Sequence, residues 1–277
     1  MQYRIIVDSC CDLTAQLREK LAITSVPLIM RLGSQEYVDD EKLNLEGFMT
    51  AMKACKERVG SAAPAPQLFQ KAMEDMKNSF VVTISSKLSG SHASALVGKA
   101  LAEGNGKAKT HIFDSKTAAA GQTLIALKLQ RLMQEGLPTE QIVQTVNQFI
   151  EDMKTYFVLE NYDNLQKNGR LSKITGRLAN ILHIKLLMGA DENGDIALYA
   201  KPRGVNQMVE KMLAMIKDSG RSAQGGDIVI SHCNNPGLAT RLADEVKSRF
   251  HFSDVHVVPT GGLSSLYADD QGVIVSF

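Results

Sequence analysis

Small hydroxyl residues follow three short apolar runs of this sequence, at the places where the runs end. The three segments are Val7-Asp8-Ser9, Ile84-Ser85-Ser86-Lys87-Leu88-Ser89-Gly90-Ser91 and Phe113-Asp114-Ser115. Each apolar run is typical of a buried strand, and a helical pattern follows it. Because the carboxyl ends of parallel strands meet at the ligand-binding edge of a sheet, we expect these tips to converge. They suit a phosphate or a carboxylate, and the absence of His, Cys and Glu from them favours binding over catalysis.

The segment from Ser85 to Ser91 carries the strongest local signal. Gly90 lets the backbone approach a ligand closely, and the next helix is expected to begin there. The free N–H groups and the dipole of a helix N-terminus attract anions. Serine is also a common helix cap, and the residues alone do not decide between capping and ligand contact. The segment is not a Walker A loop, since no Gly-Lys-Ser/Thr follows at the required spacing.

Other polar residues support weaker hypotheses. Ser61, in a predicted loop from Gly60 to Pro66, offers one more hydroxyl to an anion, although a connector without function is commoner. We expect Asp8 and Asp114 to hold loops by backbone hydrogen bonds, since a carboxylate would repel an anionic ligand. Ser231-His232-Cys233 offers a nucleophile, but neighbours on a strand point to opposite faces, which disfavours a serine hydrolase.

The composition limits the classes of function. The chain has 277 residues, 44% hydrophobic and 22% charged, as in a globular protein. Its formal net charge is +1 and it has no Trp, so nothing favours nucleic acid as a partner. Its four cysteines form no Cys-x-x-Cys pair, and neither a metal nor a cofactor is expected. Without a signal-peptide pattern or an apolar run long enough to span a bilayer, we expect a reduced, cytoplasmic protein.

The order of the predicted elements indicates an α/β fold. Strand and helix patterns alternate through the first half, which predicts a parallel sheet with helices on both faces. After about residue 154 a hairpin around Asn193-Gly194 and mixed elements predict a smaller α/β domain with a mixed sheet. We therefore expect an N-terminal domain over 1–154 and a C-terminal domain over 155–277. The early strands are expected at 4–7, 23–32, 80–84 and 109–113, and the early helices at 15–21, 45–59, 67–77, 92–102 and 117–134.

The ordered set of motifs resembles the DegV family of bacterial lipid-binding proteins, which includes the fatty acid-binding subunits of the fatty acid kinase system. The resemblance covers nearly the whole chain, and each piece of it is weak alone. The matching segments are Asp8-Ser9, Asp12-Leu13, Val26-Pro27-Leu28, the stretch from Tyr37 to Asp39, the Ser85 to Ser91 segment, Asp114-Ser115 with Gly121, Asn168-Gly169-Arg170-Leu171-Ser172, and Lys201 with Arg203.

The resemblance implies a DegV-like, two-domain α/β fold, with a three-layer parallel-sheet domain followed by the smaller mixed one. A long-chain fatty acid would lie between the domains, its acyl tail in an apolar tunnel and its carboxylate held by hydroxyls and backbone N–H groups. In the family a partner kinase phosphorylates the bound fatty acid, so the resemblance implies that this protein is not itself an enzyme. A monomer or weak homodimer without stable membrane insertion is expected.

The resemblance also assigns residues. Ser61 falls where the family has a carboxylate-contacting Thr or Ser, and Tyr267 falls about where it has a His. The implied fatty acid-binding residues are Ser61, Ser89, Gly90, Ser91 and Tyr267, and the implied partner-docking residues are Arg170 and Arg203. The chemistry agrees, because a carboxylate that leaves water needs hydrogen-bond donors. Each buried methylene adds roughly 0.8 kcal/mol, so a long tail binds tightly even with a modest head-group site.

Two differences from the family pattern keep other hypotheses open. The family's Thr-Ser-Gln-Pro loop is Ser61-Ala62-Ala63-Pro64 here, and Tyr267 is a poor substitute for His in proton transfer. Binding of another amphiphile, or a regulatory role, is one alternative. The enzymatic alternative is a hydrolase or phosphotransferase that uses Ser89 or Ser231. A phosphotransferase would need a nucleotide site, and the sequence contains no P-loop.

Overall fold

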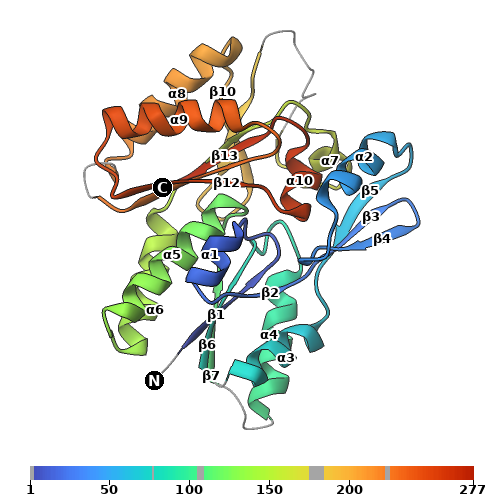
Figure 1. Cartoon of the computed structure of the whole chain (residues 1–277), viewed down its shortest axis with the longest axis vertical. Coiled ribbons are helices and arrows are strands. Elements are labelled where there is room, and N and C mark those ends of the chain that lie inside the picture. Colours follow the sequence, from blue (N-terminus) through green and yellow to red (C-terminus); the bar gives the residue numbers. More distant parts are fainter. Residues whose placement is uncertain (1–2, 77, 105–108, 175–183, 222–224) are drawn as a thin grey trace.

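Three β-sheets organise the computed structural model, which describes residues 3–76, 78–104, 109–174, 184–221 and 225–277 (Figure 1). A four-stranded sheet has the order β2-β1-β6-β7, and all its pairs are parallel. A six-stranded sheet has the order β10-β9-β8-β13-β11-β12, and a three-stranded sheet has the order β4-β3-β5. In the six-stranded sheet β11 and β12 are parallel and the other pairs antiparallel. The predicted α/β class, with a parallel sheet followed by a mixed one, is confirmed.

Both faces of the parallel sheet are covered by helices, because successive side chains of each strand point to opposite sides. In β1, Ile5 and Val7 belong to the large central core, whereas Ile6 packs with Phe69 and Ala95 of α3 and α4. The elements of this part are β1 (Arg4–Asp8), α1 (Ala15–Lys20), β2 (Thr24–Val26), α3 (Pro66–Met76), β6 (Asn78–Thr83), α4 (Ser91–Gly104) and β7 (Lys109–Asp114).

The mixed sheet alternates in the same way. In β11, Ile228 and Ile230 pack with residues of α8 and α9, whereas Val229 faces the large central core. The elements of this part are β8 (Thr155–Val158), α7 (Asp163–Lys167), β9 (Leu187–Ala190), β10 (Ile196–Ala200), α8 (Gly204–Asp218), β11 (Asp227–His232), α9 (Pro236–Arg249), β12 (Asp254–Pro259) and β13 (Val273–Ser276).

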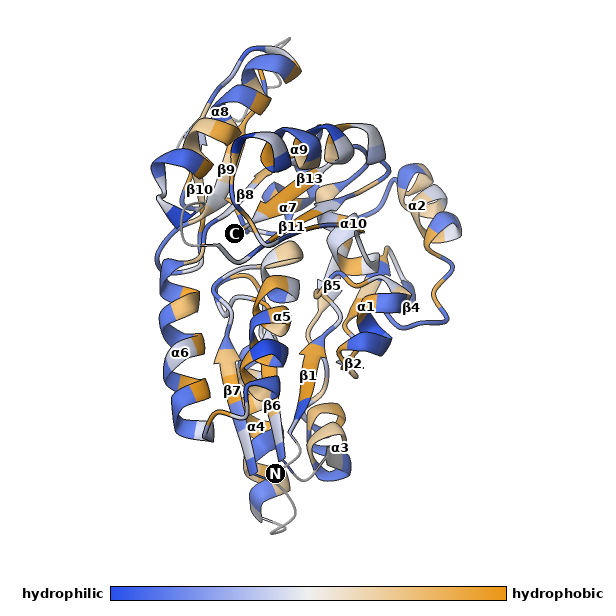
Figure 2. Ribbon diagram, turned by 60° about the vertical axis from the view of Figure 1, so that its left-hand side comes forward, coloured by the Kyte–Doolittle hydropathy of each residue, from blue (hydrophilic) through white to orange (hydrophobic). Residues whose placement is uncertain are grey.

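Helix α5 (Ala120–Gln134) lies between the two large sheets (Figures 1 and 2). It contacts β1 and β6 on one side and β11 and β13 on the other. Ten of its 15 residues are buried, as expected for a helix enclosed by other elements. Helix α6 (Thr139–Asp152) packs along α5 from outside. The two sheets therefore share one hydrophobic core, and Figure 2 shows its apolar strands in orange.

The three-stranded sheet corrects several sequence expectations. The predicted helix at 45–59 ends at Ala54, since Cys55 has an extended backbone and Val59–Ala62 joins β3 as strand β5. The predicted loop from Gly60 to Pro66 is therefore a strand in its first half. The apolar run at 23–32 forms two strands in different sheets, separated at Pro27, which cannot donate to a ladder. Two elements were not predicted at all, β4 (Gln35–Val38) and α10 (Gly262–Ala268); the others here are α2 (Leu45–Ala54) and β3 (Ile29–Leu32).

All strands of the parallel sheet precede residue 154, and all strands of the mixed sheet follow it. We therefore keep the division into 1–154 and 155–277 as a proposal, while α10 of the second part packs on α2 and β3 of the first. Within the ranges given above, no helix has the length and apolar character needed to cross a bilayer.

The fully buried carboxylate of Asp8 joins four segments at the tips of the parallel strands. Its Oδ1 accepts from the Cys10 N–H at 3.3 Å and from Gln122 Nε2 of α5 at 2.9 Å. Its Oδ2 accepts from the Ile84 N–H at 2.8 Å and from Ser91 Oγ at 2.6 Å. Burial raises the pKa of Asp8, and these hydrogen bonds oppose that shift. The predicted loop-holding role of Asp8 is confirmed.

Asp8→Ala is expected to lower the free energy of unfolding by at least about 3 kcal/mol. The substitution leaves several buried donors without an acceptor, each of which costs roughly 1–3 kcal/mol. Urea unfolding measures the loss. The control is Asp114→Ala, which removes a half-buried carboxylate that accepts from the N–H groups of Ser86 and Lys116. Equal losses in the two variants would contradict a special role for Asp8.

Candidate functional site

A cavity of about 110 Å³ lies between the tips of the parallel strands and the mixed sheet. Larger hollows of about 970 and 570 Å³ occur elsewhere, but charged side chains such as Lys109 and Arg221 line them. The wall of the 110 Å³ cavity is mostly apolar and draws on both halves of the chain. Its apolar residues are Ile84, Leu88, Ala118, Ala119, Phe157, Leu159, Leu165, Ala190, Ile196, Leu263, Ala268 and Ile274.

Polar side chains from distant parts of the sequence meet at one end of this cavity, which we call the mouth. Tyr267 Oη of α10 lies 2.8 Å from Ser61 Oγ of β5. The Arg170 guanidinium lies 5.5 Å from the centre of the Tyr267 ring, and its Nε donates to the Leu88 carbonyl at 3.1 Å. Arg170, Tyr267 and Leu88 also line the cavity. The structure thus brings together Ser61, Arg170 and Tyr267, all of which the sequence analysis had singled out.

The segment Ser89-Gly90-Ser91 borders the mouth directly after Leu88. Ser89 Oγ accepts the Ser91 N–H at 3.2 Å, and no described residue accepts the Ser89 hydroxyl proton. Gly90 is exposed, and a Cβ built on it would lie 3.6 Å from Ala63 Cβ, so the Ser61 segment is adjacent. The Ser91 hydroxyl donates to Asp8 instead of facing a ligand. Ligand contact by all three residues stays a prediction, with Ser91 in a supporting position.

The first turn of α4 also presents backbone donors. The N–H groups of His92 and Ala93 have no hydrogen-bond acceptor in the described part of the chain. Such orphan N–H groups are a regular feature of helix N-termini and attract anions. Ser94 Oγ donates to the Pro64 carbonyl, which fixes the end of the Ser61 segment against this turn. Both readings of the serine segment, capping and anion binding, thus have a geometric basis.

Arg203 lies apart from the other predicted residues. It is exposed at the N-terminus of α8, and its N–H donates to Gln207 Oε1. It is not part of the cavity wall. Its role in partner docking stays a prediction, and such a contact would lie on the outer surface, away from the cavity.

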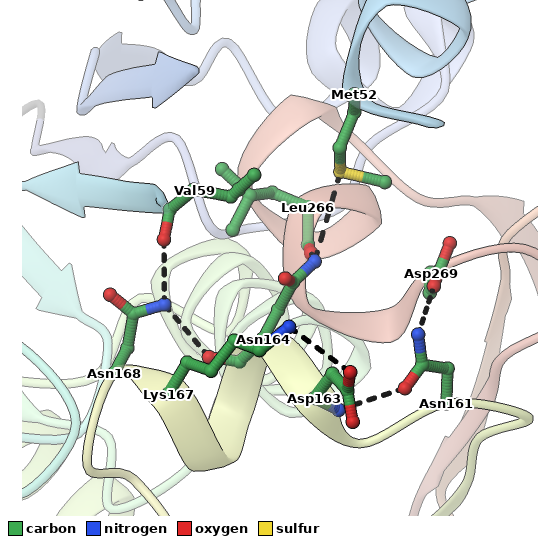
Figure 3. Close-up of polar contacts among 9 residues, drawn as sticks. All are labelled: Met52, Val59, Asn161, Asp163, Asn164, Lys167, Asn168, Leu266 and Asp269. Atoms are coloured by element: carbon green, nitrogen blue, oxygen red, sulfur yellow. Dashed lines mark hydrogen bonds and ion pairs between the residues drawn. The ribbon is translucent and has the colours of Figure 1, made fainter. Parts of the chain in front are cut away.

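Helix α7 holds the two sides of the mouth in register (Figure 3). Asn168 Nδ2 donates to the Val59 carbonyl of β5 at 2.9 Å, and Asn164 Nδ2 donates to the Leu266 carbonyl of α10 at 2.8 Å. At the start of the helix, Asn161 Nδ2 donates to Asp269 Oδ2 at 3.0 Å. Ser61 lies two residues after Val59 and Tyr267 directly after Leu266, so Asn168 and Asn164 link the strand and the helix that carry the two hydroxyls.

The end of α7 directs Arg170 toward the mouth. Gly169 has a φ of +78°, which glycine adopts without the steric cost of a side chain. The Gly169 N–H donates to the Gln166 carbonyl and the Arg170 N–H to the Leu165 carbonyl, as in a Schellman ending. This reversal turns the Arg170 side chain back over Tyr267.

The mouth holds a cation without a carboxylate partner. Arg170 donates to two carbonyl groups, those of Leu88 and Asn168, and forms no ion pair with any described acidic residue. Among the described residues of the cavity wall, the one carboxylate belongs to Asp195, which pairs with Lys173 at 2.5 Å. A half-buried guanidinium without a counter-charge favours an anionic ligand.

Two buried carboxylates anchor α10, which carries Tyr267. Asp39 accepts from the N–H groups of Gly262 and Leu263, each at 3.0 Å, and Asp12 Oδ1 accepts from the Gly261 N–H at 2.9 Å. Burial raises the pKa of both groups, that of Asp12 to about 6. Asp12 Oδ2 is buried and has no hydrogen-bond partner among the described residues.

Sequence reasoning missed part of the wall. Of the residues that line the cavity, only Arg170 and Tyr267 were predicted as site residues, and the polar wall residues Thr117 and Thr155 were not. Asp12 and the stretch ending at Asp39 were recognised as segments that match the family. Because both carboxylates bind the N-terminus of α10, these segments were the only clue in the sequence to the presence of that helix. Burial raises the pKa of the Cys10 thiol, which disfavours a reactive thiolate in the wall.

The enzymatic alternative finds little support in the geometry. Ser231 is fully buried, and its Oγ has no hydrogen-bond partner in the part of the chain that the structure describes. His92, near Ser89 in sequence, bonds through Nδ1 to Thr83 Oγ1. In the described ranges, no histidine is bonded to Ser89 or Ser231, so neither serine has the adjacent base that a nucleophile needs.

One group of possible metal ligands lies outside the cavity wall. Side-chain atoms of Asp227, Asp254 and His256 lie within 4.8 Å of one another. Both carboxylate oxygens of Asp227 accept from Arg131, at 3.0 and 3.2 Å, so an ion pair already accounts for this carboxylate. We draw no metal proposal from it.

Comparison with known sequences agrees with this geometry. The family model of the DegV family matches residues 2–276. A DegV domain-containing protein of Streptococcus pneumoniae serotype 4 is 35% identical over 280 residues, which cover 100% of this chain and 99% of the relative.

Solved structures give the same result. A DegV family protein of Ruminococcus gnavus, refined with vaccenic acid, is 35% identical with a TM-score of 0.93, and 99% of each chain is covered. The fatty acid kinase (Fak) B3 protein of Streptococcus pneumoniae, loaded with linoleic acid, is 34% identical with a TM-score of 0.91. That match covers 100% of this chain and 99% of the other.

The raised pKa of Asp12 predicts a pH-dependent stability. The pKa rises from 3.8 to about 6 on folding, so the contribution of Asp12 to stability is full below about pH 4 and is lost as the pH rises through about 6. As the pH rises from 4 to 8, the free energy of unfolding of the wild type should fall by up to about 3 kcal/mol relative to that of Asp12→Asn. This figure follows from a shift of about two pKa units at roughly 1.4 kcal/mol each.

Urea unfolding of the two proteins between pH 4 and pH 8 tests this expectation. The matched control is Asp75→Asn, an exposed carboxyl on α3, whose difference from the wild type should stay constant. A difference between wild type and Asp12→Asn that does not change with pH would refute the assignment.

Proposed function

The chain belongs to the DegV family, and on that premise we propose that it binds a long-chain fatty acid in the 110 Å³ cavity, with the carboxylate at the mouth. The single observation that carries this proposal is the unpaired Arg170 guanidinium beside the hydroxyls of Ser61 and Tyr267, at one end of an apolar cavity. An amphiphile with an anionic head and an apolar tail matches both ends of such a site.

The head group finds several donors there. The Ser89 hydroxyl, the orphan N–H groups of α4 and the free side of the Arg170 guanidinium all lack acceptors in the described residues. Hydrogen bonds to a charged group contribute roughly 1.5–3 kcal/mol each, more than neutral ones. The carboxylate therefore replaces its lost hydration with donors that are already oriented.

The tail supplies most of the affinity. Each buried methylene contributes roughly 0.8 kcal/mol, and the wall consists largely of Leu, Ile, Phe and Ala side chains. An apolar cavity of roughly 150 Å³ accommodates a benzene molecule. A complete acyl chain therefore needs wall side chains to move outward as it enters.

The protein is a binder and not a catalyst, and the Fak B3 relative suggests its partner. We propose that a fatty acid kinase phosphorylates the bound carboxylate, because the mouth borders exposed Gly90 and a phosphoryl donor can approach from solvent. Arg170 and Arg203 are the proposed partner-docking residues, and no cofactor is required. Further proposals are a cytoplasmic location, in keeping with four free cysteines, a monomeric or weakly dimeric state, and a lipid held between 1–154 and 155–277.

Native mass spectrometry of the purified protein, followed by organic extraction of what it carries, tests the proposal. A stoichiometric fatty acid is expected, and its mass reports the chain length. An empty protein that also fails to take up added fatty acids would overturn the proposal and would favour the alternative of another amphiphile.

Arg170→Met should weaken fatty acid binding by roughly 10- to 100-fold, because it removes a charged donor from the mouth. Ser89→Ala should weaken it by a smaller factor, roughly 2- to 10-fold. Displacement of a fluorescent fatty acid measures both. Arg203→Met is the matched control, since it removes an exposed arginine outside the cavity wall and should leave binding unchanged. Equal effects of the two arginine variants would exclude a head-group role for Arg170.

A further inference from the structure

Two threonine hydroxyls lie in the mostly apolar cavity wall. Thr117 comes from the loop between β7 and α5, and Thr155 begins β8; they are 2% and 6% exposed. Their Oγ1 atoms are 2.7 Å apart, and Thr155 Oγ1 is also 2.7 Å from Ser276 Oγ of β13. A hydroxyl in an apolar wall costs free energy unless it is hydrogen-bonded, and these three form a chain that meets this requirement in part.

This hydroxyl chain lies where the cavity adjoins a second hollow. A smaller hollow of about 60 Å³ shares Thr117, Thr155 and Ala190 with the cavity and continues toward charged residues such as Lys116 and Asp191. None of the mouth residues Ser61, Ser89, Arg170 and Tyr267 lines that hollow. The threonines therefore face the part of an acyl chain that lies away from its carboxylate.

The three hydroxyls carry three protons but form only two hydrogen bonds with one another, so one proton needs an acceptor outside the chain of hydroxyls. If the protons run from Ser276 through Thr155 to Thr117, the last proton has only the Ala118 carbonyl, at 3.4 Å, among the described acceptors. If they run the other way, the Ser276 proton has no acceptor in the described part of the chain. An oxygen on a ligand in the cavity would accept the Thr117 proton and complete the first arrangement.

The surrounding backbone keeps Thr117 in this position. A Cβ on Gly121 of α5 would lie 2.3 Å from Thr117 Oγ1, so the glycine leaves the space that this side chain fills. The Thr117 N–H donates to Ser115 Oγ at 3.2 Å, and its carbonyl accepts from the Ser85 N–H at 2.8 Å. The hydroxyl is thus oriented before any ligand arrives, which lowers the entropic cost of using it.

We propose that the cavity selects acyl chains that carry an acceptor oxygen within the tail, such as hydroxy fatty acids, and that Thr117 donates to this oxygen. The inference rests on the proposed function and deepens it by naming the substrate class. A plain acyl chain leaves the Thr117 proton with a long and poorly aligned acceptor. A hydroxyl on the tail loses a hydrogen bond to water when it enters the cavity, and the hydrogen bond from Thr117 replaces it.

The test compares the affinities of octadecanoic acid and its positional hydroxy isomers, mid-chain and terminal, by displacement of a fluorescent fatty acid. Thr117→Val keeps the shape of the side chain and removes the donor. At least one hydroxy isomer should bind the wild type on the order of tenfold more tightly than it binds Thr117→Val. Binding of octadecanoic acid should change by less than about twofold. Thr50→Val, on the exposed face of α2, should leave both affinities unchanged.

A second pair of variants keeps the test decisive if Thr117→Val does not fold, as judged by circular dichroism. Thr117→Ala also removes the donor and should abolish the same preference, whereas Thr117→Ser keeps the hydroxyl and should retain it. Hydroxy isomers that bind the wild type and the variants without this hydroxyl in the same ratio to octadecanoic acid would overturn the inference and leave the proposed function intact. Failure of the wild type to bind any of these acids would instead count against the proposed function.

Discussion

The structure depends on one buried carboxylate, that of Asp8. A carboxylate away from water requires donors, and Asp8 collects them from its own turn, from the end of β6, from the start of α4 and from α5. Two of these segments line the cavity, through Cys10 and Ile84, so the hydrogen bonds of a single side chain hold part of the cavity wall in place. The Ser91 hydroxyl donates to Asp8. Within Ser89-Gly90-Ser91, it is therefore Ser89 whose hydroxyl can donate to a ligand.

The mouth differs from the Asp8 site, because several of its hydrogen-bond donors have no acceptor among the described residues. Its framework is held by hydrogen bonds, since Asn164 and Asn168 fix α10 and β5, and Asp12 and Asp39 fix the start of α10. The groups that face the cavity are left with unused donors, notably on Arg170 and Ser89. A hydrogen-bonded framework around unused donors is the arrangement expected of a preformed binding site, because reorganisation on binding is small.

The sequence predicted those features that depend on local pattern. Apolar runs followed by Ser and Gly correctly identified the strands and tips of the parallel sheet. Strand β5 was missed because Gly60, Ser61 and Ala62 are small residues without strand preference, and their pairing with β3 is a long-range contact. Helix α10 was missed because the Asp39 that binds its first turn lies 223 residues earlier in the chain. Ser61 was noted as a hydroxyl in a predicted loop and Tyr267 was identified through the family resemblance, and only the fold shows that they meet.

The position of α5 has a consequence for how a ligand enters. A cleft between two bodies usually opens by rotation about a hinge, with each body keeping its own core. Here α5 packs into both large sheets at once, and the core runs through it without a break. Rotation of one sheet away from the other would expose apolar surface along most of this helix, at a cost of roughly 25 cal/mol for each Å². Exchange of the lipid must therefore proceed through local displacement of loops and side chains. The mobility of the residues in the cavity wall should then set the exchange rate, rather than a hinge motion that separates the two halves.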